Sequence, residues 1–267
     1  MDAPLDFFVH IPKTAGLTML GILREQYPPG AILSLRGTED AARPALLAGA
    51  SARVRVVAGH VHANFSRHLP RPCRLFTILR EPVERVLSLY YFVAREKGMG
   101  NHEAVVRGDL TIEEMARRHG SMQARYVAGY DPAAKVPDDQ LLREAKATLA
   151  DQIAVFGLTE RFDESLLLFN AALGWNVRGY RRENVTRKRP QRETIAPANL
   201  ETVRGHSAID LVFYEFAREL FARRILEQPP DFAERLAALR RGIEKTQRFN
   251  VARTAGRLIW RTLGLRN

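Results

Sequence analysis

The hydrophobic residues of this chain fall into short continuous runs, separated by longer segments with helical spacing. The runs predict five strands, over Leu5–Ile11, Ala31–Leu35, Val54–Ala58, Arg74–Leu79 and Ile153–Leu158. Strands that helices cover on both faces show such unbroken runs. The helical spacing predicts helices over Leu17–Gln26, Glu39–Ala48, Val83–Lys97, Ile112–His119, Asp138–Ala150, Glu164–Leu173 and Asp210–Glu227, and a helical tail from about Asp231 to Gly264. This alternation predicts an α/β fold of three layers, α/β/α, with a mainly parallel central sheet.

The last part of the chain differs in character from the rest. We expect one domain over residues 1–230 and a basic amphipathic helical tail over residues 231–267. One face of that tail is apolar and another carries arginines, so it can lie on anionic lipid; packing on its own domain or on a second subunit is an equal alternative. The apolar residues are Val251, Ala255, Leu258, Ile259 and Leu263, and the arginines are Arg253, Arg257 and Arg261. The oligomeric state stays open.

Composition limits the classes of partner and compartment. The chain has 41 Lys and Arg against 30 Asp and Glu, a formal net charge of +11. Such a surface attracts phosphates, sulfates, acidic polymers or anionic membrane, but it also suits a soluble protein without a polyanionic partner. Cys73 is the single cysteine, so no internal disulfide or cysteine zinc cluster can form. The segment Met1–Phe8 lacks the basic start of a signal peptide. We therefore expect a cytoplasmic protein; where the tail binds lipid and does not pack on protein, the lipid is the inner face of the membrane.

Three segments follow the first, third and fourth predicted strands: His10–Thr18, Gly59–His62 and Arg80–Ser88. Open parallel sheets bind ligands at the carboxyl ends of their strands, so these segments are expected to meet. In the first, loop amides and a helix N-terminus would attract an anion, Gly16 would allow close approach, and Lys13 adds a full charge. The Walker A order Gly-Lys-Ser/Thr is absent, because Lys13 precedes Gly16 by three residues. A metal-dependent nucleotide kinase is thereby disfavoured, although it remains an alternative.

The other two segments carry a second candidate anion site and a candidate base. Arg80 ends a strand and Ser88 lies about two helical turns later, a combination that suits a phosphate group. An ion pair of Arg80 with Glu84 is the alternative structural interpretation. His60 can accept a proton near neutral pH, and His62 is a lesser candidate.

Two of these segments resemble known motifs. His10-Ile11-Pro12-Lys13-Thr14-Ala15-Gly16 and Arg80-Glu81-Pro82 with the helix that follows resemble the nucleotide-binding motifs of sulfotransferases that use 3′-phosphoadenosine 5′-phosphosulfate (PAPS). The branch is the one that contains heparan sulfate 2-O-sulfotransferase and its bacterial relatives. The resemblance implies a P-loop-like sulfotransferase fold, 3′-phosphate contacts from Arg80 and Ser88, and His60 as the base. It implies 5′-phosphosulfate contacts from Lys13, Thr14, Ala15, Gly16, Leu17 and Thr18, with Lys13 assisting the departing phosphate. Leu17 and Glu81 depart from the family's usual hydroxyl residue and aspartate.

Two further segments extend the resemblance, which runs from about Phe7 to Phe221. Gly179–Pro190 resembles a late nucleotide loop and implies PAPS contacts from Thr186, Lys188 and Arg189. Gln123–Gly129 resembles a mid-chain segment and implies acceptor contacts from Gln123 and Arg125, with His62 nearby. The implied reaction moves a sulfuryl group from PAPS to a hydroxyl of a glycan or glycolipid, without a metal and without a nucleic-acid partner. A non-catalytic binder of acidic polymers is the alternative from another class.

Overall fold

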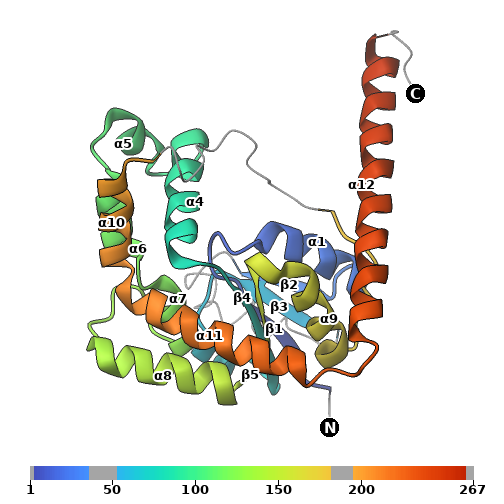
Figure 1. Ribbon diagram of the computed structural model, residues 1–267, viewed down its shortest axis with the longest axis horizontal. Coiled ribbons are helices and arrows are strands. Elements are labelled where there is room, and N and C mark those ends of the chain that lie inside the picture. The colour runs from blue at the N-terminus through green and yellow to red at the C-terminus, as the bar shows by residue number, and fades with distance from the viewer. Residues whose placement is uncertain (1–2, 36–52, 182–194, 263–267) are drawn as a thin grey trace.

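A five-stranded sheet with every strand parallel lies at the centre of the computed structural model (Figure 1). The structure describes residues 3–35, 53–181 and 195–262, with side chains up to residue 247. The strand order is β2-β3-β1-β4-β5. The strands are β1 (Leu5–Val9), β2 (Ile32–Leu35), β3 (Val56–Gly59), β4 (Cys73–Leu79) and β5 (Ile153–Leu158). All five predicted strands are confirmed, with bounds within two residues.

Helices follow most of the strands, and those predicted within the described residues are confirmed. They are α1 (Gly16–Gln26), α4 (Pro82–Arg95), α6 (Ile112–His119), α8 (Asp138–Asp151), α9 (Phe162–Leu173), α11 (Ala208–Leu226) and α12 (Phe232–Thr262). The helix expected over Glu39–Ala48 lies outside the described residues. Three short helices and two 3₁₀ segments were not predicted: α5 (His102–Arg107), α7 (Met122–Ala128), α10 (Pro197–His206), η1 (Ala63–His68) and η2 (Thr159–Arg161).

The sheet is buried on both faces, which explains its unbroken apolar runs. Phe7 and Phe8 point to opposite faces of β1 because strand side chains alternate, and both are completely buried. Phe8 stacks on Phe76 of the neighbouring strand with the ring centroids 5.1 Å apart. In Figure 1, α1 and α9 lie over one side of the sheet and α8 and α11 over the other. The prediction of an α/β/α fold with a parallel central sheet is confirmed.

A second group of helices extends beyond the sheet. Helices α4, α5, α6 and α10 lie together away from α1 and α9 (Figure 1). They share an apolar cluster of their own, in which Val86, Met115 and Val203 are almost inaccessible to solvent. Since α4 starts directly after β4, this group is anchored to the carboxyl edge of the sheet, where the functional segments lie.

The first part of α12 packs on the domain. Leu239 and Ile243 of this helix belong to the main core cluster. A methyl group at Gly242 would come within 1.8 Å of the carbonyl oxygen of Arg178, so helix and loop are in close contact. The side chains of residues 248–267 are outside the described part, and the proposed lipid-facing surface of the tail stays a prediction. None of the helices described here combines the length and apolarity that crossing a bilayer requires.

Candidate functional site

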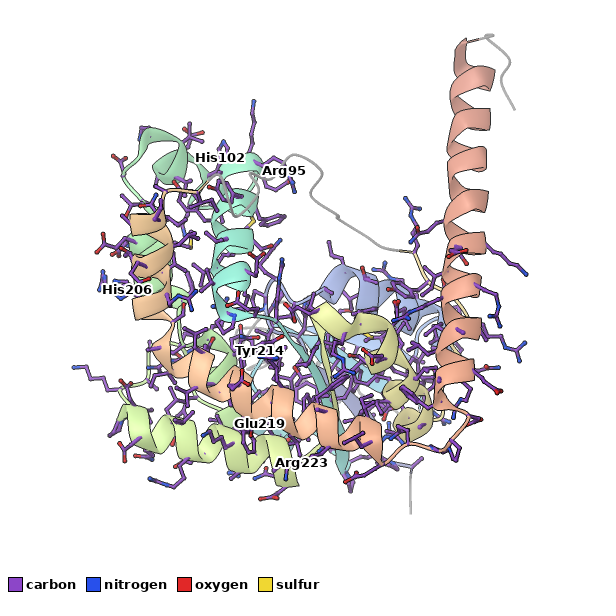
Figure 2. All side chains as sticks on the ribbon, viewed as in Figure 1. Arg95, His102, His206, Tyr214, Glu219 and Arg223 are labelled. Atoms are coloured by element: carbon purple, nitrogen blue, oxygen red, sulfur yellow. The ribbon has the colours of Figure 1, made fainter. Side chains whose placement is uncertain are left out.

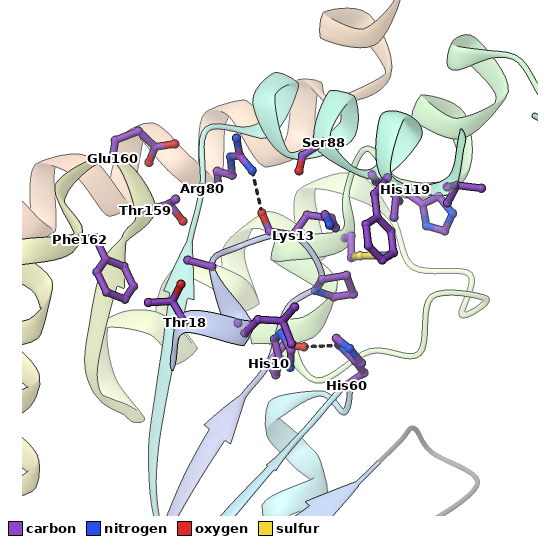
Figure 3. Close-up of a pocket in the computed structure, with 18 of the residues that line it drawn as sticks. His10, Lys13, Thr18, His60, Arg80, Ser88, His119, Thr159, Glu160 and Phe162 are labelled. Atoms are coloured by element: carbon purple, nitrogen blue, oxygen red, sulfur yellow. Dashed lines mark hydrogen bonds between the residues drawn. The ribbon is translucent and has the colours of Figure 1, made fainter. Parts of the chain in front are cut away.

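A cavity of about 950 Å³ opens at the carboxyl edge of the sheet. All three segments predicted to meet there contribute to its wall, through Lys13, His60, Arg80 and Ser88 among others (Figure 3). The segment after β5 also reaches it, from Thr159 to Glu164. The volume lies near the top of the range of roughly 300–1,000 Å³ typical of small-molecule sites. The expected convergence of strand ends is therefore present.

The loop between β1 and α1 has the backbone of an anion-binding turn. Lys13 and Ala15 adopt left-handed conformations with φ values of 71° and 65°. Such conformations are unusual for residues with a Cβ and gather at ligand-binding loops. Buried Thr14 donates its hydroxyl to the carbonyl oxygen of Ile11 at 2.8 Å, which ties the turn together. The turn and the first amides of α1 thus offer N–H groups to an anion in the cavity.

Lys13 provides the full positive charge of this loop. Its ammonium nitrogen lies 3.6 Å from the centre of the Phe92 ring, a cation–π contact. Burial, together with the nearby charges of Arg80 and Arg95, lowers the pKa of Lys13 to about 8. Arg95 sits in the last turn of α4 (Figure 2). An anionic ligand would relieve this crowding of positive charge.

Arg80 joins the two candidate anion motifs directly. Its guanidinium donates to the carbonyl oxygen of Lys13 at 3.2 Å. The same guanidinium forms an ion pair with Glu84, one turn along α4, at 3.5 Å. Ser88 lies one further turn along and lines the cavity (Figure 3). The ion pair and the shared cavity therefore coexist, and Arg80 can serve both.

The backbone around Arg80 is fixed by a buried amide. Gln123 has no solvent exposure, and its side chain accepts from the Arg80 N–H and donates to the Arg80 carbonyl, both at 2.8 Å. Gln123 itself is fixed by Asp210 of α11, whose carboxylate accepts from the N–H groups of Gln123 and Ala124 at 3.0 and 2.9 Å. Asp210 thereby caps the start of α7. A chain of contacts runs from α11 to the end of β4.

The segment after β5 supports the end of β4, next to Arg80, from the other side. Glu160 accepts from the N–H of Glu81 at 2.9 Å. Tyr214, near the middle of α11 (Figure 2), donates its hydroxyl to Glu160 at 2.5 Å. Because Glu160 also lines the cavity, α11 supports the Arg80 region on two sides.

His60 is oriented by the backbone of β1. Its Nδ1 lies 2.9 Å from the carbonyl oxygen of His10 (Figure 3). A carbonyl only accepts, so Nδ1 carries the proton and Nε2 keeps its lone pair. Burial lowers the pKa of His60, which keeps the ring neutral at pH 7. His60 therefore has the tautomer and the protonation state of a general base.

The ring of His10 fills the space between this histidine and the anion loop. The His10 and His60 ring centroids are 4.1 Å apart. A methyl group at Gly16 would lie 1.6 Å from Nε2 of His10, so only glycine fits there. Burial together with the nearby charges of His60 and Lys13 lowers the pKa of His10 to about 3, and its ring stays neutral.

Comparisons with known proteins agree with this arrangement. Heparan sulfate 2-O-sulfotransferase 1 of Gallus gallus is 28% identical over 169 residues, which cover 54% of this chain and 46% of that protein. The proteins of the same name from Mus musculus and Homo sapiens are 27% identical over the same shares. The chain is thus similar in sequence to the heparan sulfate 2-O-sulfotransferases. It spans about half the length of these sulfotransferases, and the resemblance seen in the motifs is confirmed.

Two other comparisons add little to that relationship. No family model matches the chain. Mouse sulfotransferase SULT7A1, solved in complex with PAP, superposes with a TM-score of 0.38 and 18% identity, covering 66% of this chain and 61% of that one. With so low a TM-score, this superposition carries no argument.

Several residues predicted for the site lie elsewhere. Gln123 is completely buried and holds Arg80, so its side chain is not available to an acceptor. Arg125 donates to the carbonyl of Ala134 at 2.8 Å, and neither it nor His62 lines the cavity. The structure therefore does not bring these three residues to the cavity, and the acceptor contacts expected from them stay predictions. Thr186, Lys188 and Arg189 lie outside the described residues.

The loop residues predicted to contact PAPS reach the cavity in different ways. Lys13, Ala15, Gly16, Leu17 and Thr18 line it. Thr14 does not, because its hydroxyl points back to Ile11 and leaves only its N–H group for the loop. The residues described include no group of three His, Cys, Asp or Glu that could hold a metal ion; the expectation of metal-free chemistry stays a prediction.

Sequence reasoning missed the supporting residues. His10 belongs to the motif His10–Gly16, but the sequence assigns it no function, because its packing on Gly16 and His60 is visible only in the fold. The segment after β5 could have been found, since the rule for strand ends applies to Ile153–Leu158 as it does to the other strands. Phe92 carries no signal of its own beyond the apolar spacing of α4.

Proposed function

We propose that this chain transfers the sulfuryl group of PAPS to a hydroxyl of an acceptor, a carbohydrate in the simplest interpretation. One observation carries the proposal. The Lys13 loop, the Arg80–Ser88 receptor and a base-competent His60 line one cavity. Two anion receptors in the wall of one cavity suit an adenosine that carries phosphates at the 3′ and 5′ positions of its ribose. The similarity to named sulfotransferases supports PAPS as that nucleotide.

In the proposed reaction the acceptor oxygen forms a bond to sulfur while the bond from sulfur to the 5′-phosphate oxygen breaks. Nε2 of His60 takes the hydroxyl proton, because Nδ1 is already engaged by His10. Lys13 and the loop amides stabilise the negative charge that develops on the departing phosphate. Arg80 and Ser88 hold the 3′-phosphate and keep the donor in line. The products are the sulfated acceptor and adenosine 3′,5′-bisphosphate (PAP).

The nucleotide part of the proposal is tested by calorimetric titration with PAP and with adenosine 5′-phosphate. We expect PAP to bind about 10–100-fold more tightly, the effect of one or two charge-assisted hydrogen bonds. Arg80→Ala should remove that difference, whereas Arg107→Ala, in an exposed ion pair outside the cavity, should keep it. Equal affinity of the unmodified chain for both nucleotides would refute the 3′-phosphate site. Turnover that needs a nucleoside triphosphate and a divalent metal would indicate the kinase alternative.

The role of the base is tested by His60→Ala. We expect turnover to fall by about 10²–10⁴-fold, the usual contribution of general base catalysis, with PAP affinity unchanged. His68→Ala is the control, because His68 is exposed on η1 and does not line the cavity. If turnover of radiolabelled PAPS with cell-envelope acceptors survives in the His60 variant, another group accepts the proton.

We also propose that the chain works in the cytoplasm, with the tail beyond residue 247 on the inner face of the membrane. Burial raises the pKa of Cys73, the single cysteine, to about 11, which makes it a poor nucleophile whether oxidants are present or not. Cosedimentation with vesicles rich in anionic lipid tests the membrane contact. Equal recovery of the full chain with neutral and anionic vesicles would count against it.

A further inference from the structure

The cavity has two ends with different chemistry. The Lys13 loop and Arg80 lie between them (Figure 3). Thr159, Glu160 and Phe162 are on one side, whereas His60 and His119 are on the other. The nucleotide must span the Lys13 loop and the Arg80 receptor, and the acceptor must reach His60. The end that holds His60 and His119 is therefore where the acceptor binds, if the proposed function is correct.

The wall at this end is apolar. We call it the acceptor compartment and define it by the lining residues Leu89, Phe92, Val93, Met99, Met115 and Met122. One contact ties it to a reacting group, and one helix face ties it to His119. Phe92 lies under the Lys13 ammonium at 3.6 Å. Met115 and His119 are one turn apart on α6, so they share a helix face.

The methionines give the compartment an adaptable surface. An unbranched thioether side chain fills irregular spaces and tolerates varied partners. Met115 and Met122 are 1% and 8% exposed, and Met99 at the rim is 39% exposed. The exposed apolar surface of the compartment thus comes mainly from Met99 and from half-buried Leu89 and Phe92, and an apolar ligand group would remove that surface from water.

Charge in this part of the cavity is sparse. The lining residues include four cations, Lys13, Arg80, Arg161 and Arg240. Arg161 pairs with Glu164 at 2.7 Å and Arg240 with Asp163 at 3.5 Å, all in the part of the wall that follows β5 or comes from α12. Lys13 is thus the one cation of the described lining that touches the acceptor compartment.

The remaining titratable group of the compartment is neutral. Burial, together with the nearby charges of Arg85 and Arg118, lowers the pKa of His119 to about 4. The guanidinium of Arg85 is completely buried and contacts the Met122 sulfur at 3.4 Å and the carbonyl of His119. It is turned to these partners and does not line the cavity. Among the described lining residues, Lys13 is the one cation that this wall offers to a densely anionic chain, and Arg95, outside the lining, lies 5.9 Å from the centre of the Phe92 ring.

We propose that the acceptor carries an alkyl or aryl group next to the hydroxyl that is sulfated, and that this group packs in the acceptor compartment. The inference rests on the proposed function and narrows it. It differs from heparan sulfate, the polyanion in the name of the relatives. A glycoside or glycolipid with an apolar aglycone has the required chemistry, and so does an alkylated phenol.

The test measures acceptor binding to the chain saturated with PAP. Two matched pairs keep the hydroxyl constant and change only the apolar group: hexyl against methyl β-glucoside, and 4-butylphenol against phenol. Burial of a methylene is worth roughly a fourfold change in affinity. We therefore expect at least about tenfold tighter binding of the longer member in one pair or both, by calorimetric titration. Equal affinities within both pairs, or no binding of either longer compound, would overturn the proposal.

Two substitutions localise the effect. Met99→Gln places an amide on the rim of the compartment and should reduce the preference for the longer member by about threefold or more. Val106→Gln is the matched control, because Val106 is 60% exposed on α5 and outside the cavity lining. An unchanged preference in the Met99 variant, at equal melting temperature, would contradict the assignment.

The prior titration with PAP separates the two levels of inference. A chain that does not prefer PAP over adenosine 5′-phosphate is not the proposed sulfotransferase. A chain that prefers PAP and ignores the apolar groups remains a sulfotransferase, and only the acceptor compartment is then misassigned.

Discussion

Replacing Gln123 by leucine should weaken the binding of PAP without weakening that of adenosine 5′-phosphate. The substitution nearly conserves the volume of a completely buried side chain. It removes both 2.8 Å hydrogen bonds that hold the N–H and the carbonyl of Arg80. Gln123 does not line the cavity, so any effect on the ligand must pass through Arg80. It is a positioning residue.

The magnitude follows from the groups left without partners. Each unsatisfied buried backbone group costs about 1–3 kcal/mol, so the native position of Arg80 loses about 2–6 kcal/mol. The strand end can relieve part of this cost by moving toward water, and that movement displaces the guanidinium. We expect about 2 kcal/mol lower unfolding free energy and about tenfold weaker PAP binding. Adenosine 5′-phosphate has no 3′-phosphate, and its affinity should stay within about twofold.

The assay combines urea denaturation with calorimetric titration of both nucleotides. Gln140→Leu is the control, since Gln140 also makes two side-chain hydrogen bonds, of 3.1 and 3.0 Å, but on α8 away from the cavity. Lower stability with unchanged PAP affinity would show that Gln123 supports the fold alone, and the reasoning about Arg80 would be wrong.

Two further predictions concern the proton acceptor and the anion loop. The pH profile of kcat/KM should be bell-shaped: activity falls at acidic pH as His60 becomes protonated, with a midpoint below its ordinary pKa of 6.5, and falls above about pH 8 as Lys13 loses its charge. Lys13→Arg should remove the alkaline limb, and a flat profile up to pH 9.5 would contradict the role of Lys13. Gly16→Ala should cost about 1–3 kcal/mol of stability by overpacking and lower turnover by about 100-fold, because the methyl group displaces His10 and with it His60. Gly21→Ala on the same helix has open space around the new methyl group and should be neutral or stabilising; equal behaviour of the two variants in denaturation and turnover would refute the packing argument.

The sheet could be predicted because burial on both faces leaves a direct record in the sequence. Every strand is a mostly apolar run, and the strand ends then place Lys13, His60 and Arg80 at one edge. Helices α4 and α11 could be predicted as well, because their apolar residues recur with helical spacing over several turns. The sequence predicts an element correctly where its apolar pattern results directly from its burial in the core.

The short helices could not be predicted, and α7 shows why. Its first N–H groups are capped by Asp210, a residue 87 positions away from Gln123. Ser121 stands at the N-cap position, but its side chain makes no capping hydrogen bond, so the local sequence does not account for this helix. The same long-range contact buries Gln123, from which the resemblance implied contacts to the acceptor. Its buried position depends on α11, which no local pattern could reveal.

The contact of His10 with both Gly16 and His60 has a consequence for how the proposed site can diversify. The imidazole of His10 packs on Gly16 of the anion loop, and the backbone carbonyl of His10 accepts from Nδ1 of His60, which leaves Nε2 of that base free to take a proton. A change at His10 would therefore affect both the anion loop and the base His60. New acceptor preferences would have to arise on the opposite wall, formed by α4, α6 and α7, where exchanges among apolar side chains leave the transfer chemistry intact.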